Sequence, residues 1–185
     1  MVRRFFAFAV VVLLAGSAFG QDGGFRHEFG ERVSNDFNVA FLAAGLLGDY
    51  WFHPGTPKDL KWNRSLRAGD ALLLSTGVTA LLKVTVDAPR PDTGAKGSFP
   101  SGHTSAAFAV ATVQSAFHPA DAPYWYFGAA LIGSSRVMLG RHRWIDVIGG
   151  AAVGYASGRI AVSGRGILLA PTFGKKPGLM VSLRF

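Results

Sequence analysis

Three short segments of the sequence contain side chains whose types and spacing could do chemistry: residues 83–91, 100–103 and 136–146. They combine lysine and arginine side chains with two histidines, and an aspartate lies four positions after the second histidine. Cations bind anions, and histidine exchanges protons near neutral pH. The segments therefore indicate a site that binds an anionic substrate and transfers protons.

The cations suit a phosphate group. Displacement at phosphorus spreads negative charge over three equatorial oxygens, and a protein assists mainly by positioning and by positive charge. Lys83, Arg90 and Arg136 would supply that charge, and each guanidinium can hold two oxygens at once. Ser101 and Gly102 lie at the start of a predicted helix, so their backbone N–H groups would add uncharged donors. Gly102 would also let the backbone approach the anion closely.

The two histidines suit different roles. Asp146 follows His142 by four positions, on the same face of the helix predicted there, so its carboxylate would hold the Nδ1 proton and leave Nε2 as a nucleophile. His103 lies beside the anion donors without an acidic neighbour, which suits the general acid that protonates the leaving group. No divalent-metal ligand set is visible, so we expect catalysis without a metal or other cofactor. The remaining histidines have no converging neighbours in the sequence, and we expect no function for them: His27, His53 and His118.

The order and spacing of the three segments resemble the signature of the type 2 phosphatidic acid phosphatase superfamily. Lys-x6-Arg-Pro, Pro-Ser-Gly-His and Ser-Arg-x5-His-x3-Asp occur in this order between residues 83 and 146. That superfamily also includes bacterial class A acid phosphatases and vanadium haloperoxidases. The resemblance implies a phosphohistidine at His142, which is hydrolysed by water that His103 activates.

Three hypotheses for the function remain. The leading one is a metal-independent phosphatase of phosphate monoesters or pyrophosphates, and the apolar helices and basic charge favour a lipid-linked substrate. A vanadate-dependent haloperoxidase would bind vanadate in the same cradle with His142 as its ligand, although such enzymes are usually far longer chains. A non-catalytic envelope protein that binds phosphate would need neither nucleophile, acid nor orienting carboxylate.

Glycine, proline and capping residues divide the chain into helices that must position these groups. We expect an all-α bundle of about five to six helices. The expected helices cover residues 35–51, 65–83, 101–117, 121–139 and 142–160. Ser65 and Ser101 are the expected caps of two of them. The helices are rich in small residues, which permits close packing, but none contains eighteen uninterrupted apolar residues. A compact bundle in solution or against a bilayer is favoured, and full membrane embedding stays open.

Both ends of the chain differ from the helical phosphatase domain expected over residues 35–163. Residues 1–20 have the basic start, apolar stretch and small residues of a cleavable signal peptide. Residues 21–34 are polar and glycine-rich, so we expect a flexible lead-in. Residues 164–185 hold two apolar runs around Gly-Lys-Lys-Pro-Gly, which predicts a short β-hairpin or tail.

Composition restricts the partners and the compartment. The formal net charge is +8, which suits an anionic partner such as a phosphate ester or a membrane lipid. The basic residues are scattered singly, without the aromatic interleaving of a nucleic-acid interface. A chain with no cysteine and a signal peptide fits export to the bacterial periplasm or to the periplasmic face of a membrane.

Overall fold

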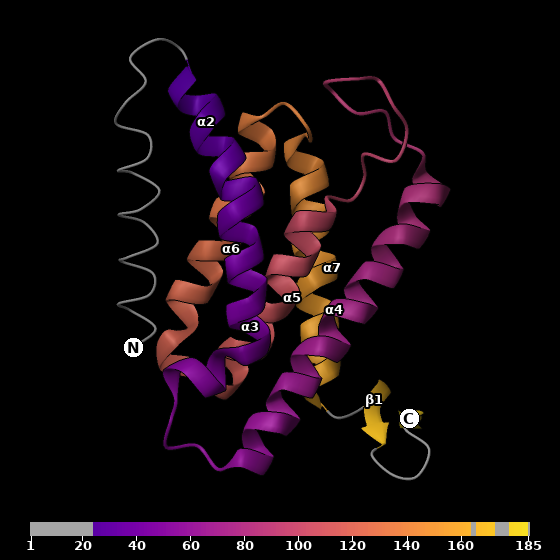
Figure 1. The fold of residues 1–185 in the computed structure, drawn as a ribbon. Helices are drawn as coiled ribbons and strands as arrows, with labels where there is room; N and C mark the ends of the chain where they lie inside the picture. Colours follow the sequence, from indigo (N-terminus) through magenta and orange to yellow (C-terminus); the bar gives the residue numbers. More distant parts are fainter. Residues whose placement is uncertain (1–23, 164–165, 173–177, 185) are drawn as a thin grey trace.

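The computed structural model describes residues 24–163, 166–172 and 178–184, so the expected signal peptide lies outside the described residues. The described chain is a helical bundle, as predicted, with a small two-stranded sheet at one end (Figure 1). Its helical elements are α2 (Gly24–Arg32), the π-helix η1 (Val33–Phe37), α3 (Asn38–Phe52), α4 (Lys58–Val86), α5 (Gly102–Phe117), the 3-10 helix η2 (Pro119–Asp121), α6 (Ala122–Met138) and α7 (Trp144–Ser163).

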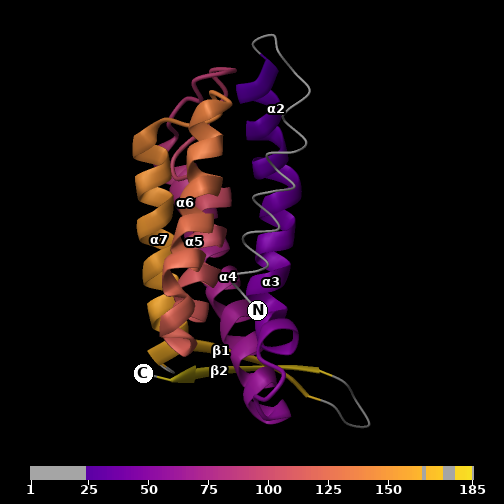
Figure 2. The same ribbon diagram turned by 90° about the vertical axis from the view of Figure 1, so that its left-hand side faces the viewer.

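Helix α5 lies at the centre of the bundle and packs against α3, α4, α6 and α7 (Figures 1 and 2). Its closest neighbour is α7, because small residues recur every four positions on the facing side of that helix. A Cβ atom added to Gly150 would lie 2.6 Å from the Ser101 carbonyl oxygen, and one added to Gly154 would lie 2.3 Å from the Ser105 carbonyl oxygen. The predicted close packing of small residues is therefore real, and it fixes the start of α5 against α7.

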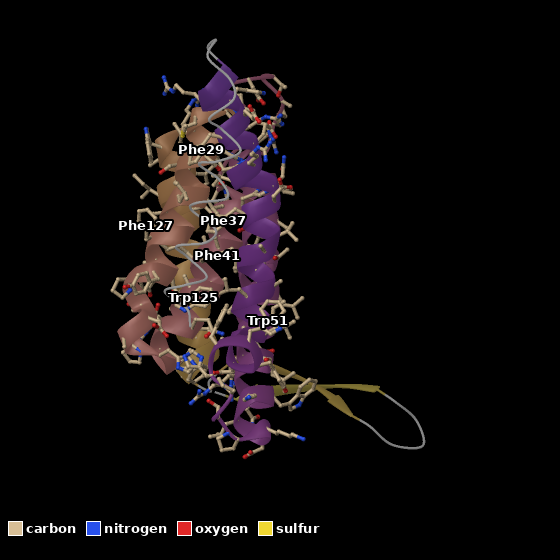
Figure 3. All side chains as sticks on the ribbon, turned by 60° about the vertical axis from the view of Figure 1, so that its left-hand side comes forward. Phe29, Phe37, Phe41, Trp51, Trp125 and Phe127 are labelled. Atoms are coloured by element: carbon tan, nitrogen blue, oxygen red, sulfur yellow. The ribbon has the colours of Figure 1, made fainter. Side chains whose placement is uncertain are left out.

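An aromatic layer joins α3 to α6. Phe41 and Trp125 are fully buried and meet edge to face, with ring centroids 5.2 Å apart, and Phe37 lies 5.7 Å from Phe41 (Figure 3). Contacts of this kind bury large apolar surfaces. The layer holds the N-terminal helices against the helices that carry the candidate site.

Two sequence-based expectations about helix boundaries are wrong. The lead-in expected to be flexible is helical from Gly24 onward, because Glu28 pairs with Arg32 at 3.0 Å and Phe29 packs on the aromatic core. Helix α4 begins at Lys58, directly after Pro57, so Ser65 lies inside the helix and caps nothing. Proline is favoured at a helix start because its missing N–H would have no helical partner there.

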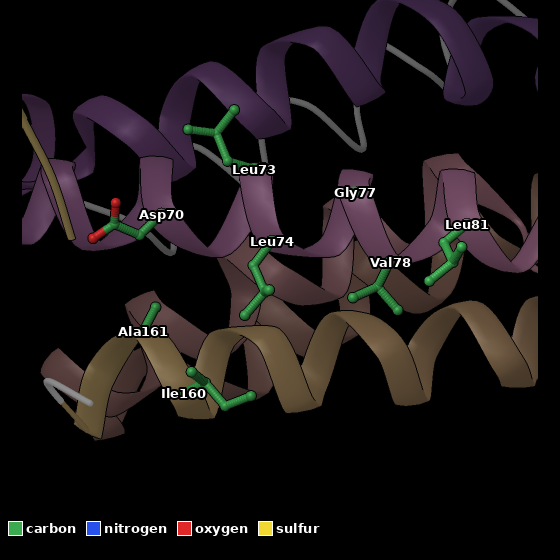
Figure 4. Close-up of a pocket in the computed structure, with 8 residues that line it drawn as sticks. All are labelled: Asp70, Leu73, Leu74, Gly77, Val78, Leu81, Ile160 and Ala161. Atoms are coloured by element: carbon green, nitrogen blue, oxygen red, sulfur yellow. The ribbon is translucent and has the colours of Figure 1, made fainter. Parts of the chain in front are cut away.

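Helices α4 and α7 are the two described helices that are long and apolar enough to cross a membrane, by length and composition. Between them lies an apolar groove of about 460 Å³, lined by one side of each helix (Figure 4). Leu73 and Leu81 on its rim are more than half exposed. The described part of the chain thus leaves an apolar surface on these two helices uncovered.

The strands β1 (Gly166–Thr172) and β2 (Gly178–Arg184) pair in antiparallel register, with Gly166 opposite Arg184 and Thr172 opposite Gly178. Strand β1 contacts α4 and α7, at the end of the bundle away from the α4–α5 loop (Figures 1 and 2).

Candidate active site

The three sequence segments meet at one end of the bundle. The loop that joins α4 to α5 and the turn that joins α6 to α7 both lie there (Figure 1). A backbone hydrogen bond of 2.9 Å from Ser101 N–H to the Asp146 carbonyl ties the loop to α7. His103 and His142 are each within the electrostatic reach of the same three cations, Lys83, Arg90 and Arg136.

His142 lies in the turn before α7, not on the helix where the sequence placed it. The reason is a helix cap: Asp146, in the first turn of α7, accepts the N–H of Arg143 at 2.9 Å with its Oδ2. This is one half of a capping box and fixes the helix start after Arg143. The turn still brings His142 Nδ1 within 3.6 Å of Asp146 Oδ2.

Ser98 lies between the histidine and the carboxylate. Its Oγ donates to Asp146 Oδ2 at 2.7 Å and is 3.4 Å from His142 Nδ1. All three side chains are buried, with at most 4% of each residue exposed. The carboxylate and the hydroxyl together favour a proton on Nδ1, which leaves Nε2 with its lone pair.

Both histidines lie in an environment that disfavours their charged forms. Burial and the charges of Arg136, Arg90 and Lys83 lower the pKa of His103 to about 4. Burial, Arg136 and Lys83 lower the pKa of His142 to about 4, although Asp146 acts in the opposite direction. In the free site both rings are therefore neutral at pH 7, and an anion that binds there would raise both pKa values.

The three cations differ in how they are held. The Lys83 ammonium donates to the carbonyls of Gly97 at 2.6 Å and Ser98 at 3.4 Å, and so fixes the α4–α5 loop. Arg136 is 7% exposed, donates to Ser34 Oγ, and has an Nε without a partner in the described chain. Arg90 has no side-chain hydrogen bond or ion pair with any described residue. The two guanidiniums thus keep donors that an anion can use.

At the N-terminus of α5, backbone N–H donors for an anion were expected at both Ser101 and Gly102, and the structure leaves only the second open. Ser101 occupies the N-cap position, but its N–H is bonded to the Asp146 carbonyl, so this N–H is not available to an anion, and its Oγ accepts from Thr104 at 2.9 Å. Gly102 and His103 begin the helix, and first-turn N–H groups have no helical acceptor. A Cβ on Gly102 would meet no protein atom closer than 3.8 Å, at Thr79. The space where a Gly102 side chain would lie is therefore open to an anion.

Comparison with known proteins identifies the family. The sequence profile of the PAP2 superfamily matches residues 65–166, more than half of the chain. The chain belongs to the PAP2 superfamily. The matched region contains every site residue predicted from the sequence, and the resemblance drawn from the motifs is thereby confirmed.

Two relatives extend this match. The chain is 37% identical over 138 residues to a lipid A 1-phosphatase of Porphyromonas gingivalis, across 71% of this chain but 30% of that one. The chain thus spans about a third of the length of this curated PAP2 relative. The crystal structure of Aquifex aeolicus LpxE superposes with a TM-score of 0.53 at 25% identity, covering 77% of this chain and 98% of that one.

Sequence reasoning missed two polar residues of this PAP2 site. Ser98 bonds Asp146 across 48 positions, and Ser34 bonds Arg136 across 102 positions. The one signal for Ser98 was its place two residues before the Pro-Ser-Gly-His segment. Ser34 had no signal, because it lies in the stretch that was expected to be a flexible lead-in.

Proposed function

We propose that this PAP2 protein is a phosphatase that hydrolyses a phosphate monoester or pyrophosphate carried by a lipid, through a phosphohistidine at His142. One observation carries the proposal: the buried His142 and the half-buried His103, whose pKa values are both lowered, share three cations, none of which forms a salt bridge among the described residues. Such a site is suited to bind an anion. A site that merely bound phosphate would not need His142 to be held by Asp146 and Ser98 as it is.

The first step forms the covalent intermediate. His142 Nε2 attacks phosphorus, the bond to the leaving-group oxygen breaks, and a proton passes from His103 to that oxygen. Asp146 stabilises the charge that His142 gains. The substrate's own negative charge raises the pKa of His103, so that this ring is protonated when the substrate is bound.

The second step releases phosphate. His103, now neutral, takes a proton from a water molecule that attacks phosphorus, and the bond from phosphorus to His142 Nε2 breaks. Arg90, Arg136 and the first-turn N–H groups of α5 hold the equatorial oxygens in both steps. The charge that a metal ion would otherwise neutralise is met by these cations, so we propose a metal-independent reaction.

A lipid carrier is supported by the surface that adjoins the site. Lys83 lies on α4 two positions after the groove residue Leu81, so the apolar face of α4 leads from the groove toward the site. The P. gingivalis relative is itself described as acting on lipid A. With the signal peptide expected over residues 1–20, we place the site on the periplasmic side of a membrane.

A phosphate-release panel tests the proposal. Soluble and lipid esters are compared with a chelator and with vanadate, and we expect release that survives the chelator and is blocked by vanadate. His103→Ala should slow alkyl esters more than nitrophenyl phosphate, because nitrophenolate leaves without a proton. Equal losses for both esters would contradict the role of His103 as the acid. Release that needs a metal would contradict the proposed mechanism.

A further inference from the structure

A chain of buried hydroxyl groups joins α4 to the N-terminus of α5. Thr79 Oγ1 donates to Ser105 Oγ at 2.9 Å, and Ser105 Oγ donates in turn to the Ser101 carbonyl oxygen at 3.0 Å. These three residues are 5%, 1% and 0% exposed. Neither Thr79 nor Ser105 belongs to the three motif segments, so this connection between the helices was not visible in the sequence.

The hydrogen bond between Thr79 and Ser105 connects candidate phosphate-binding groups on the two helices. Thr79 is one helical turn before Lys83 on α4, and Ser105 is in the first turn of α5. The bond therefore links the part of α4 that carries one of the three cations to the part of α5 whose free N–H groups begin at Gly102. A shift of α4 relative to α5 would move the cation and these donors apart.

Thr79 also borders the space in which an anion would lie. Its Cγ2 atom is 3.8 Å from the position that a Cβ on Gly102 would occupy. Helix α7 packs closely on the same end of α5, because a Cβ on Gly150 would lie 2.6 Å from the Ser101 carbonyl oxygen. Close backbone packing thus fixes this end of α5 against α7, and a hydrogen bond fixes it against α4.

We propose, on the basis of the proposed function, that Thr79 is a positioning residue whose hydroxyl places the first-turn N–H groups of α5 against the transferring phosphoryl group. Donors stabilise the charge of a transition state only where they are already in position, and a misplacement of about 1 Å can lower the rate roughly 100-fold. The methyl group of Thr79 is not needed for this role. The proposal therefore separates the two parts of one side chain.

The test compares two variants of Thr79 that each remove one of these parts. Thr79→Val keeps the shape and removes the hydroxyl, so kcat and kcat/KM for nitrophenyl phosphate should fall together, roughly tenfold, because the lost interaction acts in the transition state. Thr79→Ser keeps the hydroxyl and should retain most of the rate. Equal losses in the two variants would overturn the proposal, since the methyl group would then be the part that matters.

Inhibitor binding separates positioning from a purely structural role. Vanadate can adopt the five-coordinate geometry of the transferring phosphoryl group, whereas phosphate stays tetrahedral, so vanadate depends more on donors in the transition-state position. Thr79→Val should therefore weaken inhibition by vanadate more than inhibition by phosphate. The matched control is Thr112→Val, which removes another buried hydroxyl of the bundle, bonded to the Phe108 carbonyl at 2.7 Å. It should leave the ratio of the two inhibition constants unchanged.

The outcomes distinguish the role of Thr79 from the proposed function. A Thr79→Val variant that matches Thr112→Val in kcat/KM and in the ratio of inhibition constants would show that the hydroxyl only stabilises the fold, which would overturn the proposal. If valine is not accommodated, Ser105→Ala breaks the same hydrogen bond from the α5 side and carries the same comparison. Absence of nitrophenyl phosphate hydrolysis by the parent protein would instead refute the proposed function itself.

Discussion

Histidine and buried aspartate meet at both ends of this bundle, with opposite charge balance. At the candidate active site, His142 and Asp146 lie among three cations without ion-pair partners in the described chain. At the far end, Asp49 Oδ1 is 2.6 Å from His118 Nε2 and 3.2 Å from Arg64, and His53 stacks on His118 with ring centroids 3.6 Å apart. The first cluster carries excess positive charge, whereas in the second cluster the carboxylate of Asp49 is paired with Arg64.

The expectation that nothing converges on His53 or His118 is wrong. Asp49 lies four positions before His53, a local signal that was not used, and 69 positions from His118, a contact that only the fold shows. Burial alone would raise the pKa of Asp49, but the hydrogen bond with His118 and the charge of Arg64 hold that pKa below its ordinary value. The cluster fastens the α3–α4 turn to the end of α5.

The geometry of this far cluster does not fit a metal ion. The rings of His53 and His118 are within 3° of parallel and only 3.6 Å apart. An ion bound by imidazole nitrogen lies near the ring plane, and it cannot lie near two parallel planes at this separation. The comparison teaches that, of the two His–Asp pairs, the one among cations without ion-pair partners in the described chain is the one suited to bind an anion.

The largest expected difference between the two clusters is in turnover. His142→Ala should lower kcat by at least about 10⁴-fold for every ester, since no covalent intermediate can form. Its circular dichroism spectrum should match that of the parent. The matched control is His118→Ala, which should keep kcat per folded molecule. Turnover that survives in His142→Ala would remove the distinction between the two clusters.

The next effect is on stability. Asp49→Asn should lower the free energy of unfolding by roughly 3 kcal/mol, because the histidine and arginine side chains lose the charge that holds them. Urea unfolding measures this change, and kcat at low urea should stay near the parent value. A variant that is as stable as the parent would show that the far cluster does not fasten the turn to α5.

The pH dependence separates the clusters further. The pKa of His103 and that of His142 are lowered to about 4 in the folded chain. Between about pH 6.5 and 4 the unfolded chain thus binds more protons, so stability from these groups is present above pH 6.5 and lost as pH falls toward 4. Sulfate, which is a dianion at both pH values, should restore more stability at pH 5 than at pH 8, because it favours the charged rings. Equal sulfate effects on the unfolding temperature at both pH values would contradict this.

The smallest expected effect is on kcat, from a change of Ser98 at the candidate active site. Ser98→Ala removes the hydroxyl that positions Asp146 beside His142, and we expect kcat to fall roughly tenfold with little change in KM. The conservative Ser98→Thr variant should recover part of the rate, which a purely structural role of Ser98 would not explain. An unchanged kcat in Ser98→Ala would show that the turn alone orients His142.

The sequence predicts those helices and site residues whose signals lie in short, continuous segments. Lys83, Arg90 and the two motif histidines were found because each lies in a short segment with a fixed pattern, and the helices followed from their breakers. The rest depends on contacts between distant residues, such as the bond from Ser98 to Asp146. Helix α2 was missed because its glycines favour a loop, whereas Phe29 packs on the core in the folded chain. Tertiary packing outweighs local propensity there.

The measurement that tests the central claim most directly is trapping of the phosphorylated enzyme. The protein is mixed with labelled nitrophenyl phosphate, quenched within one turnover, and digested under conditions that preserve phosphohistidine. We predict label on the peptide that contains His142, none in His142→Ala, and more label in His103→Ala because hydrolysis of the intermediate then lacks its base. A protein that releases phosphate without label on His142, or that carries the label on another residue, would contradict the account.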